Sequence, residues 1–142
     1  PSDLNAAYLW AQLEEADAVN QRRMENWNLY YELLQGLKEA GTVELPVVPE
    51  GCVHNGHMFY IKARDLKERT ALLKHLKEKG ISAVFHYVPL HSSEAGRKYG
   101  RFHGQDKHTT KESDRLLRLP MYDGLKEEQI RYVVSEIKNF YR

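Results

Sequence analysis

Residues 57–85 read HMFYIKARDLKERTALLKHLKEKGISAVF, and this stretch decides the fold. Its beginning, 57–62, predicts a strand because Phe59 and Ile61 would share one face. Its end, 81–85, is short and largely apolar and predicts a second strand. The segment between them has the pattern of a helix. Strand, helix and strand in succession indicate a sheet covered by helices.

The central helix carries signals at both ends. Asp65 can accept hydrogen bonds from the free N–H groups at its start, and Gly80 stands where a helix usually stops. Its apolar face is formed by Leu66, Leu72, Leu73 and Leu76. Both signals and the leucine spacing therefore support the same helix.

Shorter elements complete this frame. We expect, in chain order, an extended piece at 42–45, a polar connection at 86–109, a short helix at 110–117, an extended piece at 118–121 and a last helix. The last helix has an apolar stripe of Ile130, Val133, Val134, Ile137 and Phe140. The predicted fold class is α+β, a small, mainly antiparallel sheet covered by helices. A loop as long as the polar connection is usually functional or mobile.

A long helix precedes this body. Residues 4–38 contain almost no helix breaker, so we expect one helix or two nearly collinear ones, capped by Ser2 or Asp3. Its length would be roughly 50 Å, whereas a compact domain of this size has a radius of gyration of about 14 to 15 Å. The helix should project from the body or break against it. We divide the chain into a linking helix, 1–38, and a small domain, 39–142.

The two halves of this helix differ in character. Its second half has one apolar stripe, made of Trp27, Tyr30, Leu34 and Leu37. Its first turns are apolar nearly all round, and such a helix is normally buried on every side. The chain also begins with Pro1 rather than Met, which suggests a start in the middle of something larger. We expect these first-turn residues to be exposed or covered by a second copy of the chain: Leu4, Ala7, Tyr8 and Trp10.

Composition excludes several classes of protein. The chain has 142 residues, 42% of them hydrophobic, which suits one domain with one core. Its 21 basic and 20 acidic residues give a formal charge of +1 and no global field that would hold nucleic acid or an anionic membrane. The single cysteine, Cys52, fits a reducing compartment, so we expect the cytoplasm. No stretch approaches the ~20 apolar residues of a membrane span.

The segment His86-Tyr87-Val88-Pro89-Leu90-His91 is the strongest candidate site. It follows a predicted strand, and two imidazoles and a phenol can donate hydrogen bonds to hydroxyls or phosphate oxygens. Pro89 stiffens the turn and lowers the cost of ordering it. Alternatively, His86 merely ends a strand and His91 is solvated. The residues alone leave both interpretations open.

Two other groups of residues carry weaker signals. Cys52, His54 and His57 are zinc-ligand types, but no second ligand pair stands at a finger-like spacing. A buried structural cysteine and a strand-edge histidine explain them better. The stretch 97–111 interleaves basic and aromatic residues and could bind a diphosphate or single-stranded nucleic acid, although such a loop is more often only solvated.

No motif of a self-contained catalyst occurs. The sequence lacks a dinucleotide-binding or phosphate-binding glycine loop, H-E-x-x-H and a serine nucleophile elbow. Several lysines lie beside acids on the central helix, which is the wrong setting for an amine that must lose its proton: Lys67, Lys74, Lys77 and Lys79.

With these residues in view, the chain resembles the DegT/DnrJ/EryC1/StrS sugar aminotransferases over essentially its whole length. The landmarks occur in order: Pro1 to Ala7, Ala11 to Glu14, Arg22-Arg23, Tyr30-Tyr31, 57–61, Gly80-Ile81, His86 to His91, and Leu117 to Tyr122. Any one is weak, but the ordered set is specific. Lys126 departs from the pattern, since relatives often start the last helix with Ser or Thr, and this weakens a cap.

The resemblance implies a fold-type I homodimer that uses pyridoxal phosphate to move an amino group, usually from glutamate, to C4 of a nucleotide-linked 4-keto-6-deoxyhexose. In such enzymes the Schiff-base lysine and most phosphate contacts belong to a large domain, which would precede Pro1. This chain would be the C-terminal small domain, with no cofactor of its own and no activity alone. His86, Tyr87 and His91 should contact the nucleotide-sugar substrate. The alternative is a free-standing nucleotide- or nucleic-acid-binding module that uses 97–111.

Overall fold

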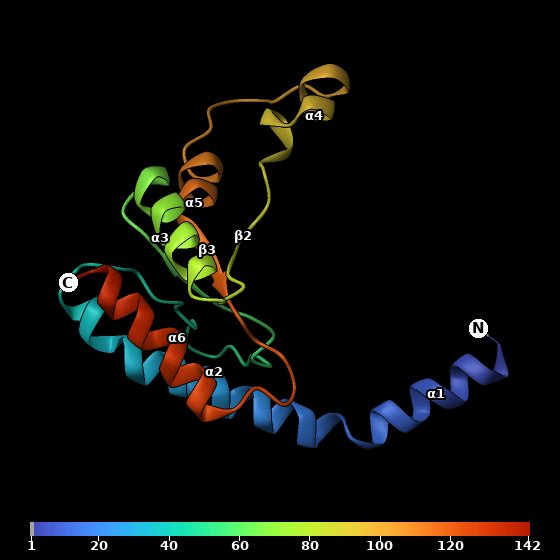
Figure 1. Cartoon of the computed structure of the whole chain (residues 1–142). Coiled ribbons are helices and arrows are strands. Elements are labelled where there is room, and N and C mark those ends of the chain that lie inside the picture. Colours follow the sequence, from blue (N-terminus) through green and yellow to red (C-terminus); the bar gives the residue numbers. More distant parts are fainter. Residues whose placement is uncertain (1) are drawn as a thin grey trace.

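A computed structural model describes residues 2–142, and Figure 1 shows a helical and sheet-containing body with two projecting parts. The elements are α1 (Asp3–Glu14), α2 (Ala16–Glu39), β1 (Phe59–Lys62), α3 (Leu66–Glu78), β2 (Val84–Phe85), the 3₁₀ turn η1 (Leu90–Ser92), α4 (Glu94–Tyr99), α5 (Thr109–Arg115), β3 (Leu116–Leu119) and α6 (Glu127–Phe140). Helix α1 projects at one end of the body, and α4 stands away from it at another. The remaining helices gather around the sheet.

The sheet has three strands in the order β1-β3-β2, and both pairings are antiparallel. The last strand in the sequence therefore lies between the two earlier ones. Phe59 pairs with Leu119 on one side of β3, and Val84 pairs with Arg118 on the other. The predicted α+β class with a small, mainly antiparallel sheet is confirmed.

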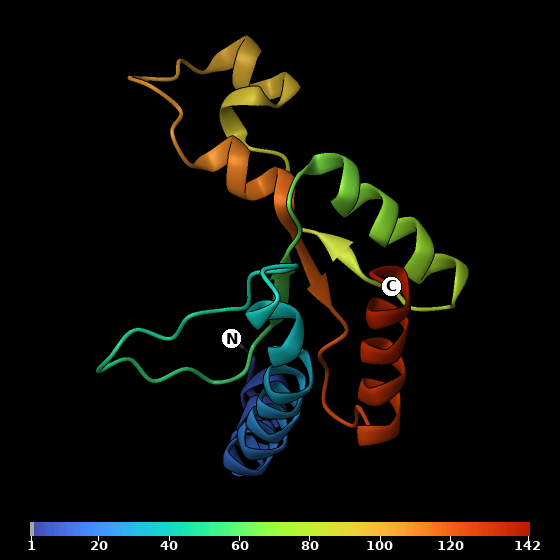
Figure 2. The ribbon, with the colours of Figure 1, turned by 90° about the vertical axis from the view of Figure 1, so that its left-hand side faces the viewer.

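One face of the sheet forms the core. Its fully or almost fully buried residues are Phe59, Ile61, Leu117 and Leu119. Helices α2, α3 and α6 cover this face, as Figure 2 shows, and contribute Tyr30, Leu72 and Ile137, each fully buried. The Tyr30 hydroxyl donates a hydrogen bond to the carbonyl of Pro120 at 3.1 Å, and burial raises its pKa. The opposite face is less covered.

The central helix behaves as its end signals predict. Asp65 accepts a hydrogen bond from the N–H of Glu68 at 2.9 Å, and Gly80 has the left-handed φ of 74° that favours glycine. Leu72 and Leu76 are fully buried, whereas Leu66 is exposed.

The second strand is much shorter than the predicted 81–85, because only Val84 and Phe85 pair with β3. The N–H of Ile81 donates to the carbonyl of Leu76 at 2.9 Å, in the hydrogen-bond pattern that closes α3. That N–H is therefore unavailable to the sheet. Val84 and Phe85 are also exposed at 43% and 47%, so this edge strand is not the buried one that an apolar run suggests.

The connection 86–109 is not a plain loop. It contains η1 and α4, and the Ser93 hydroxyl accepts a hydrogen bond from the N–H of Gly96 at 2.9 Å. Gly96 packs so closely that a Cβ there would lie 1.6 Å from the Leu90 carbonyl oxygen. A helix of six residues has no apolar period that could reveal it.

The helix predicted at 110–117 ends two residues early, at Arg115. Leu116 and Leu117 belong to β3 instead, where Leu117 pairs with Ile61 and enters the core. The predicted extended piece at 118–121 correspondingly begins earlier. Pairing with β1 outweighs the local helical pattern at these two residues.

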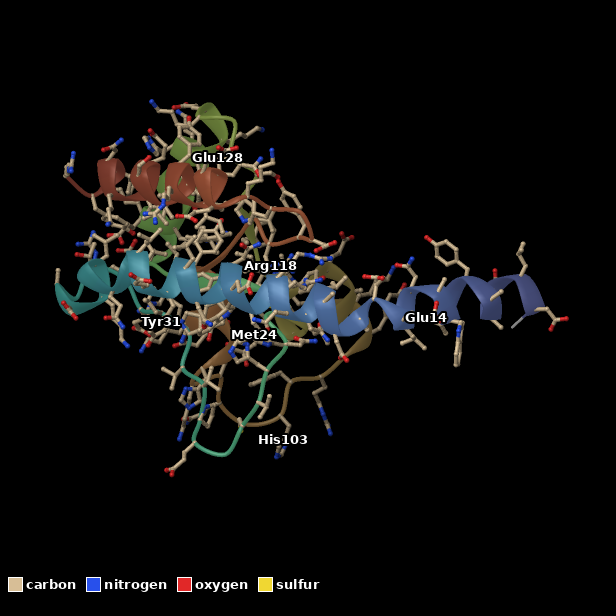
Figure 3. All side chains as sticks on the ribbon, turned by 90° about the horizontal axis from the view of Figure 1, so that it is seen from below. Glu14, Met24, Tyr31, His103, Arg118 and Glu128 are labelled. Atoms are coloured by element: carbon tan, nitrogen blue, oxygen red, sulfur yellow. The ribbon has the colours of Figure 1, made fainter. Side chains whose placement is uncertain are left out.

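The long helix breaks at Glu15 into α1 and α2. Trp27, Tyr30 and Leu34 of α2 enter the core, whereas no residue of α1 is buried. Figure 3 shows the side chains of α1 extending from the ribbon beyond the body. The expectation of exposed first-turn residues is confirmed, with 81% for Leu4 and 68% for Trp10. The division at residue 38 stays a prediction.

Within residues 2–142, no helix combines the length and the apolar character that a membrane crossing requires.

Deleting residues 2–14 should leave the free energy of unfolding of the body within about 0.5 kcal/mol of the full chain, because α1 adds nothing to the core. Urea unfolding followed by circular dichroism measures this. Leu34→Ala is the positive control and should cost about 2 to 5 kcal/mol, since Leu34 is fully buried. A comparable loss on deleting α1 would show that it packs on the body.

Candidate functional site

The backbone turns sharply where β2 ends. Tyr87 has a φ of 50°, and it is the only residue other than glycine with a positive φ among residues 2–142. This region is costly for a bulky residue, and such strain persists only where surrounding contacts hold it. The Ser113 hydroxyl supplies one contact by donating to the carbonyl of Tyr87 at 2.7 Å. The Tyr87 side chain is 68% exposed, so the strained backbone presents its ring outward.

Two nitrogen-bearing side chains flank the Tyr87 ring. The His86 ring lies 4.7 Å from it between centroids, and the Arg118 guanidinium carbon lies 5.7 Å from its centroid. Val84 pairs with Arg118, and His86 follows Val84 by two residues. Because side chains alternate between the two faces of a sheet, Arg118 and His86 both lie on the outer face, opposite the core.

Both flanking residues contain a buried nitrogen without a partner. These atoms are Nδ1 of His86 and Nε of Arg118, and neither has a hydrogen bond among residues 2–142. A buried polar group that lacks a partner costs free energy. These two unpaired nitrogens make the surroundings of the Tyr87 ring the strongest candidate for a binding site.

A cavity of about 340 Å³ opens beside this group. Its lining residues are His86, Tyr87, Val88, Pro89, Thr109, Glu112, Ser113 and Leu116. Glu112 lies 2.6 Å from the Lys62 ammonium and 3.6 Å from the Arg115 guanidinium. The hydrogen bond from Lys62 is the main cause that lowers the pKa of Glu112. The acid in the cavity wall is thus already paired with bases.

His91 belongs to a separate cluster. Its Nε2 lies 3.0 Å from Oδ2 of Asp106 and 3.4 Å from the Thr110 hydroxyl, and its ring packs 4.5 Å from Phe102. The structure therefore brings His86 and Tyr87 together and places His91 in contacts that tie η1 to the start of α5. Its contact with substrate stays a prediction.

Sequence reasoning did not single out three residues that support these clusters. Ser113 and Asp106 look like ordinary polar loop and helix residues, and only the contacts of the folded chain reveal them. Arg118 offers one signal, because it is a charged residue inside the otherwise leucine-rich strand Leu116–Leu119.

The zinc interpretation finds no support. Among residues 2–142 no group of three or more His, Cys, Asp or Glu side chains could hold a metal ion. His54 packs 4.5 Å from Trp27, and its Nδ1 accepts a hydrogen bond from the N–H of Gly56, which is a structural role. The expected buried cysteine is wrong, because Cys52 is exposed in the loop between α2 and β1.

The basic stretch 97–111 lies on and after α4. Arg97, Lys98 and Arg101 are exposed, and Lys98 stands 5.1 Å over the ring of its neighbour Tyr99. Asp106 interrupts the stretch and faces His91. The arrangement is that of a solvated helix with an acid beside it.

The three-stranded antiparallel sheet with helices on its core face matches the C-terminal domain of fold-type I aminotransferases. The model of the DegT/DnrJ/EryC1/StrS aminotransferase family matches residues 2–138, and the chain belongs to this family. It corresponds to the C-terminal region of the sugar aminotransferases in this family, and the family uses pyridoxal phosphate.

Solved structures agree with this assignment. One is DesV of S. venezuelae, solved in complex with a ketimine intermediate. Its sequence is 28% identical to this chain, and the two structures match with a TM-score of 0.80. The match covers 95% of this chain and 35% of DesV. A DegT DnrJ EryC1 StrS aminotransferase from Brucella abortus is 26% identical to this chain with a TM-score of 0.79, and the match covers 95% of this chain and 34% of that protein.

A sequence relative matches over a similar range. The "Pleiotropic regulatory protein" of Geobacillus stearothermophilus is 33% identical over 144 residues, which cover 99% of this chain and 37% of that protein. The chain thus spans about a third of the length of these relatives.

The cavity at Tyr87 does not fit the attachment of pyridoxal phosphate. No lysine lines the cavity at Tyr87. Lys62 lies nearby and contacts the cavity acid Glu112, whose hydrogen bond raises the pKa of Lys62. A lysine held in its charged form cannot attack a carbonyl. The cavity at Tyr87 therefore offers no amine that could bond the cofactor.

The cluster around Asp106 should respond to acid. Hydrogen bonds from Thr110, followed by the charge of His91, lower the pKa of Asp106. Because this folded-state pKa is depressed, the contribution of Asp106 to stability is present above the ordinary carboxyl pKa of about 3.9 and is lost as the pH falls through the folded value. An NMR titration of the Thr110 amide should show its midpoint below about 3.9.

Two variants check which groups cause this titration of the Thr110 amide signal. Asp106→Asn should abolish the titration. Thr110→Val should move its midpoint up toward the ordinary carboxyl pKa, because the variant removes the hydroxyl donor. A midpoint unchanged by Thr110→Val would show that the hydroxyl does not set the pKa.

Proposed function

We propose that this chain is the substrate-side part of an aminotransferase that moves an amino group from glutamate to C4 of a dTDP-4-keto-6-deoxyhexose in the synthesis of surface-polysaccharide precursors. Within the family, two segments favour dTDP-4-amino-4,6-dideoxygalactose transaminase as the particular enzyme. They are Leu4 to Trp10 and His108 to Ser113, which resemble the corresponding segments of that transaminase. Membership of a sugar aminotransferase family supports the general reaction.

The observation that carries the proposal is the outward presentation of Tyr87 between His86 and Arg118. The ring is held by a strained backbone, and the nitrogens beside it lack partners. A fixed aromatic surface with unused hydrogen-bonding atoms can pack on a sugar or base and bind its polar groups. His91 would contribute from the neighbouring cluster.

The proposal also specifies partners. The large domain of the enzyme would bind the cofactor and supply the Schiff-base lysine, and the working enzyme would be a homodimer in the cytoplasm. The exposed apolar side chains of α1 supply a surface for such a contact. Neither nucleic acid nor membrane would be a partner, since the formal charge is only +1.

Binding of a sugar nucleotide to the 142-residue chain tests the proposal directly. Titration with dTDP-glucose, followed by NMR, should shift the resonances of His86 and Tyr87. The double variant His86→Ala/Tyr87→Ala should weaken binding about tenfold or more, because an aromatic contact and an imidazole contact are both lost. Tyr99→Ala, an exposed aromatic residue on α4, is the matched control and should change nothing.

Two further mixtures separate the proposal from its rivals. Pyridoxal phosphate added to the chain should give no strong, borohydride-trappable visible band, because the cavity at Tyr87 has no lysine in its lining. A short oligonucleotide at low salt should not bind. Salt-dependent binding that is lost in Arg97→Ala/Lys98→Ala/Arg101→Ala would instead support the nucleic-acid module.

A further inference from the structure

Arg118 differs from every other arginine in the described chain. It is only partly exposed, yet no hydrogen bond or ion pair within residues 2–142 engages it. Arginines that are similarly enclosed do have partners: Arg69 donates to the carbonyl of Asp114 at 3.0 Å, and Arg115 donates to the carbonyl of Ala63 at 2.9 Å. The other unpaired arginines in this part of the chain are exposed, namely Arg97, Arg101 and Arg142.

The position of the Arg118 guanidinium explains why its N–H donors remain available for a ligand. Its carbon lies over the ring of Tyr87 at 5.7 Å, so the two groups attract each other through the face of the ring. A guanidinium held near a ring face keeps its N–H donors unpaired, and its terminal N–H groups can bind a planar or tetrahedral oxyanion. Tyr87 therefore orients the group without consuming its donors.

Nearby charges do not neutralise Arg118. The acid in the adjacent cavity wall, Glu112, is held by Lys62 at 2.6 Å and Arg115 at 3.6 Å. The other flank of Tyr87 carries His86, whose buried Nδ1 also lacks a partner. The outer face of the sheet thus holds one uncompensated positive charge and one unused ring nitrogen about a single aromatic ring.

We infer that Arg118 binds an oxyanion of the substrate on the outer face of the sheet, with His86 as a second hydrogen-bonding group. This inference rests on the proposed function and deepens it, because it assigns an anionic group of the ligand to a residue that was not among the predicted contacts. Two sources share this chemistry: the diphosphate of the sugar nucleotide and a carboxylate of the amino-acid donor.

The experiment compares the 142-residue chain with Arg118→Gln and Arg118→Lys. Gln keeps part of the aliphatic side chain but removes the positive charge. Lys keeps the charge but lacks the planar guanidinium with its paired N–H donors. Arg131→Gln is the matched control, since it removes one charge from an exposed ion pair on α6. Circular dichroism and urea unfolding establish that each variant is folded.

Three probes separate the sources: inorganic pyrophosphate, L-glutamate and dTDP-glucose. The anion that Arg118 binds should bind about tenfold more weakly to Arg118→Gln, with partial recovery in Arg118→Lys and no change in Arg131→Gln. It should also shift the Arg118 Nε–H resonance, which a purely structural role would not do. Pyrophosphate dependence identifies the diphosphate, and glutamate dependence identifies the donor carboxylate.

The outcomes also separate this inference from the proposed function. If Arg118→Gln binds all three probes as the natural chain does, while His86→Ala/Tyr87→Ala loses dTDP-glucose, the oxyanion site is overturned and the proposed function stands. If pyrophosphate or glutamate binds through Arg118 but dTDP-glucose does not bind, the site stands and the proposed function fails. No binding of any probe at millimolar concentration overturns both.

Discussion

The placement of β3 between β1 and β2 is the constraint on which the rest of the structure depends. Leu117 and Leu119 point into the core from this strand, and Arg118 between them points to the opposite face. Because side chains alternate along a strand, a shift of one residue would bury the guanidinium and expose both leucines. The hydrophobic core therefore fixes the position of the charge at the candidate site.

A second set of contacts fixes α5 against the end of β1. The N–H of Ala63 donates to the carbonyl of Arg115 at 2.9 Å, and Nε of Arg115 donates back to the carbonyl of Ala63 at 2.9 Å. Arg115 also pairs with Glu44, which forms a bridge with Lys62 of β1. The Arg115 side chain is only 13% exposed, although that of Glu44 is 54% exposed, and the charges on both partners strengthen the hydrogen bond between them. These contacts hold the helix from which Ser113 reaches Tyr87.

Local chemistry made much of the fold predictable, and long-range pairing set the remainder. Asp65 and Gly80 mark the ends of α3 because capping depends on residues adjacent in sequence. Ile81 misleads, since its apolar side chain suits a strand while its N–H completes the end of a helix. The candidate site was likewise predictable only where it depends on residues adjacent in sequence. His86 and Tyr87 stand out in the sequence. Their proximity to Arg118 depends on the pairing of Val84 with Arg118, which are 34 positions apart.

Several costly features of the described chain lie outside its hydrophobic core. The positive φ of Tyr87 and the unpaired buried nitrogens of His86 and Arg118 each raise the free energy of the folded chain. None of them contributes to the packing of α2, α3 and α6 on the sheet. A core that is complete without them can hold Tyr87 in its strained form through β3, α5 and Ser113. Binding a ligand there would then require little further ordering, which is the physical advantage of placing a recognition surface on a rigid sheet.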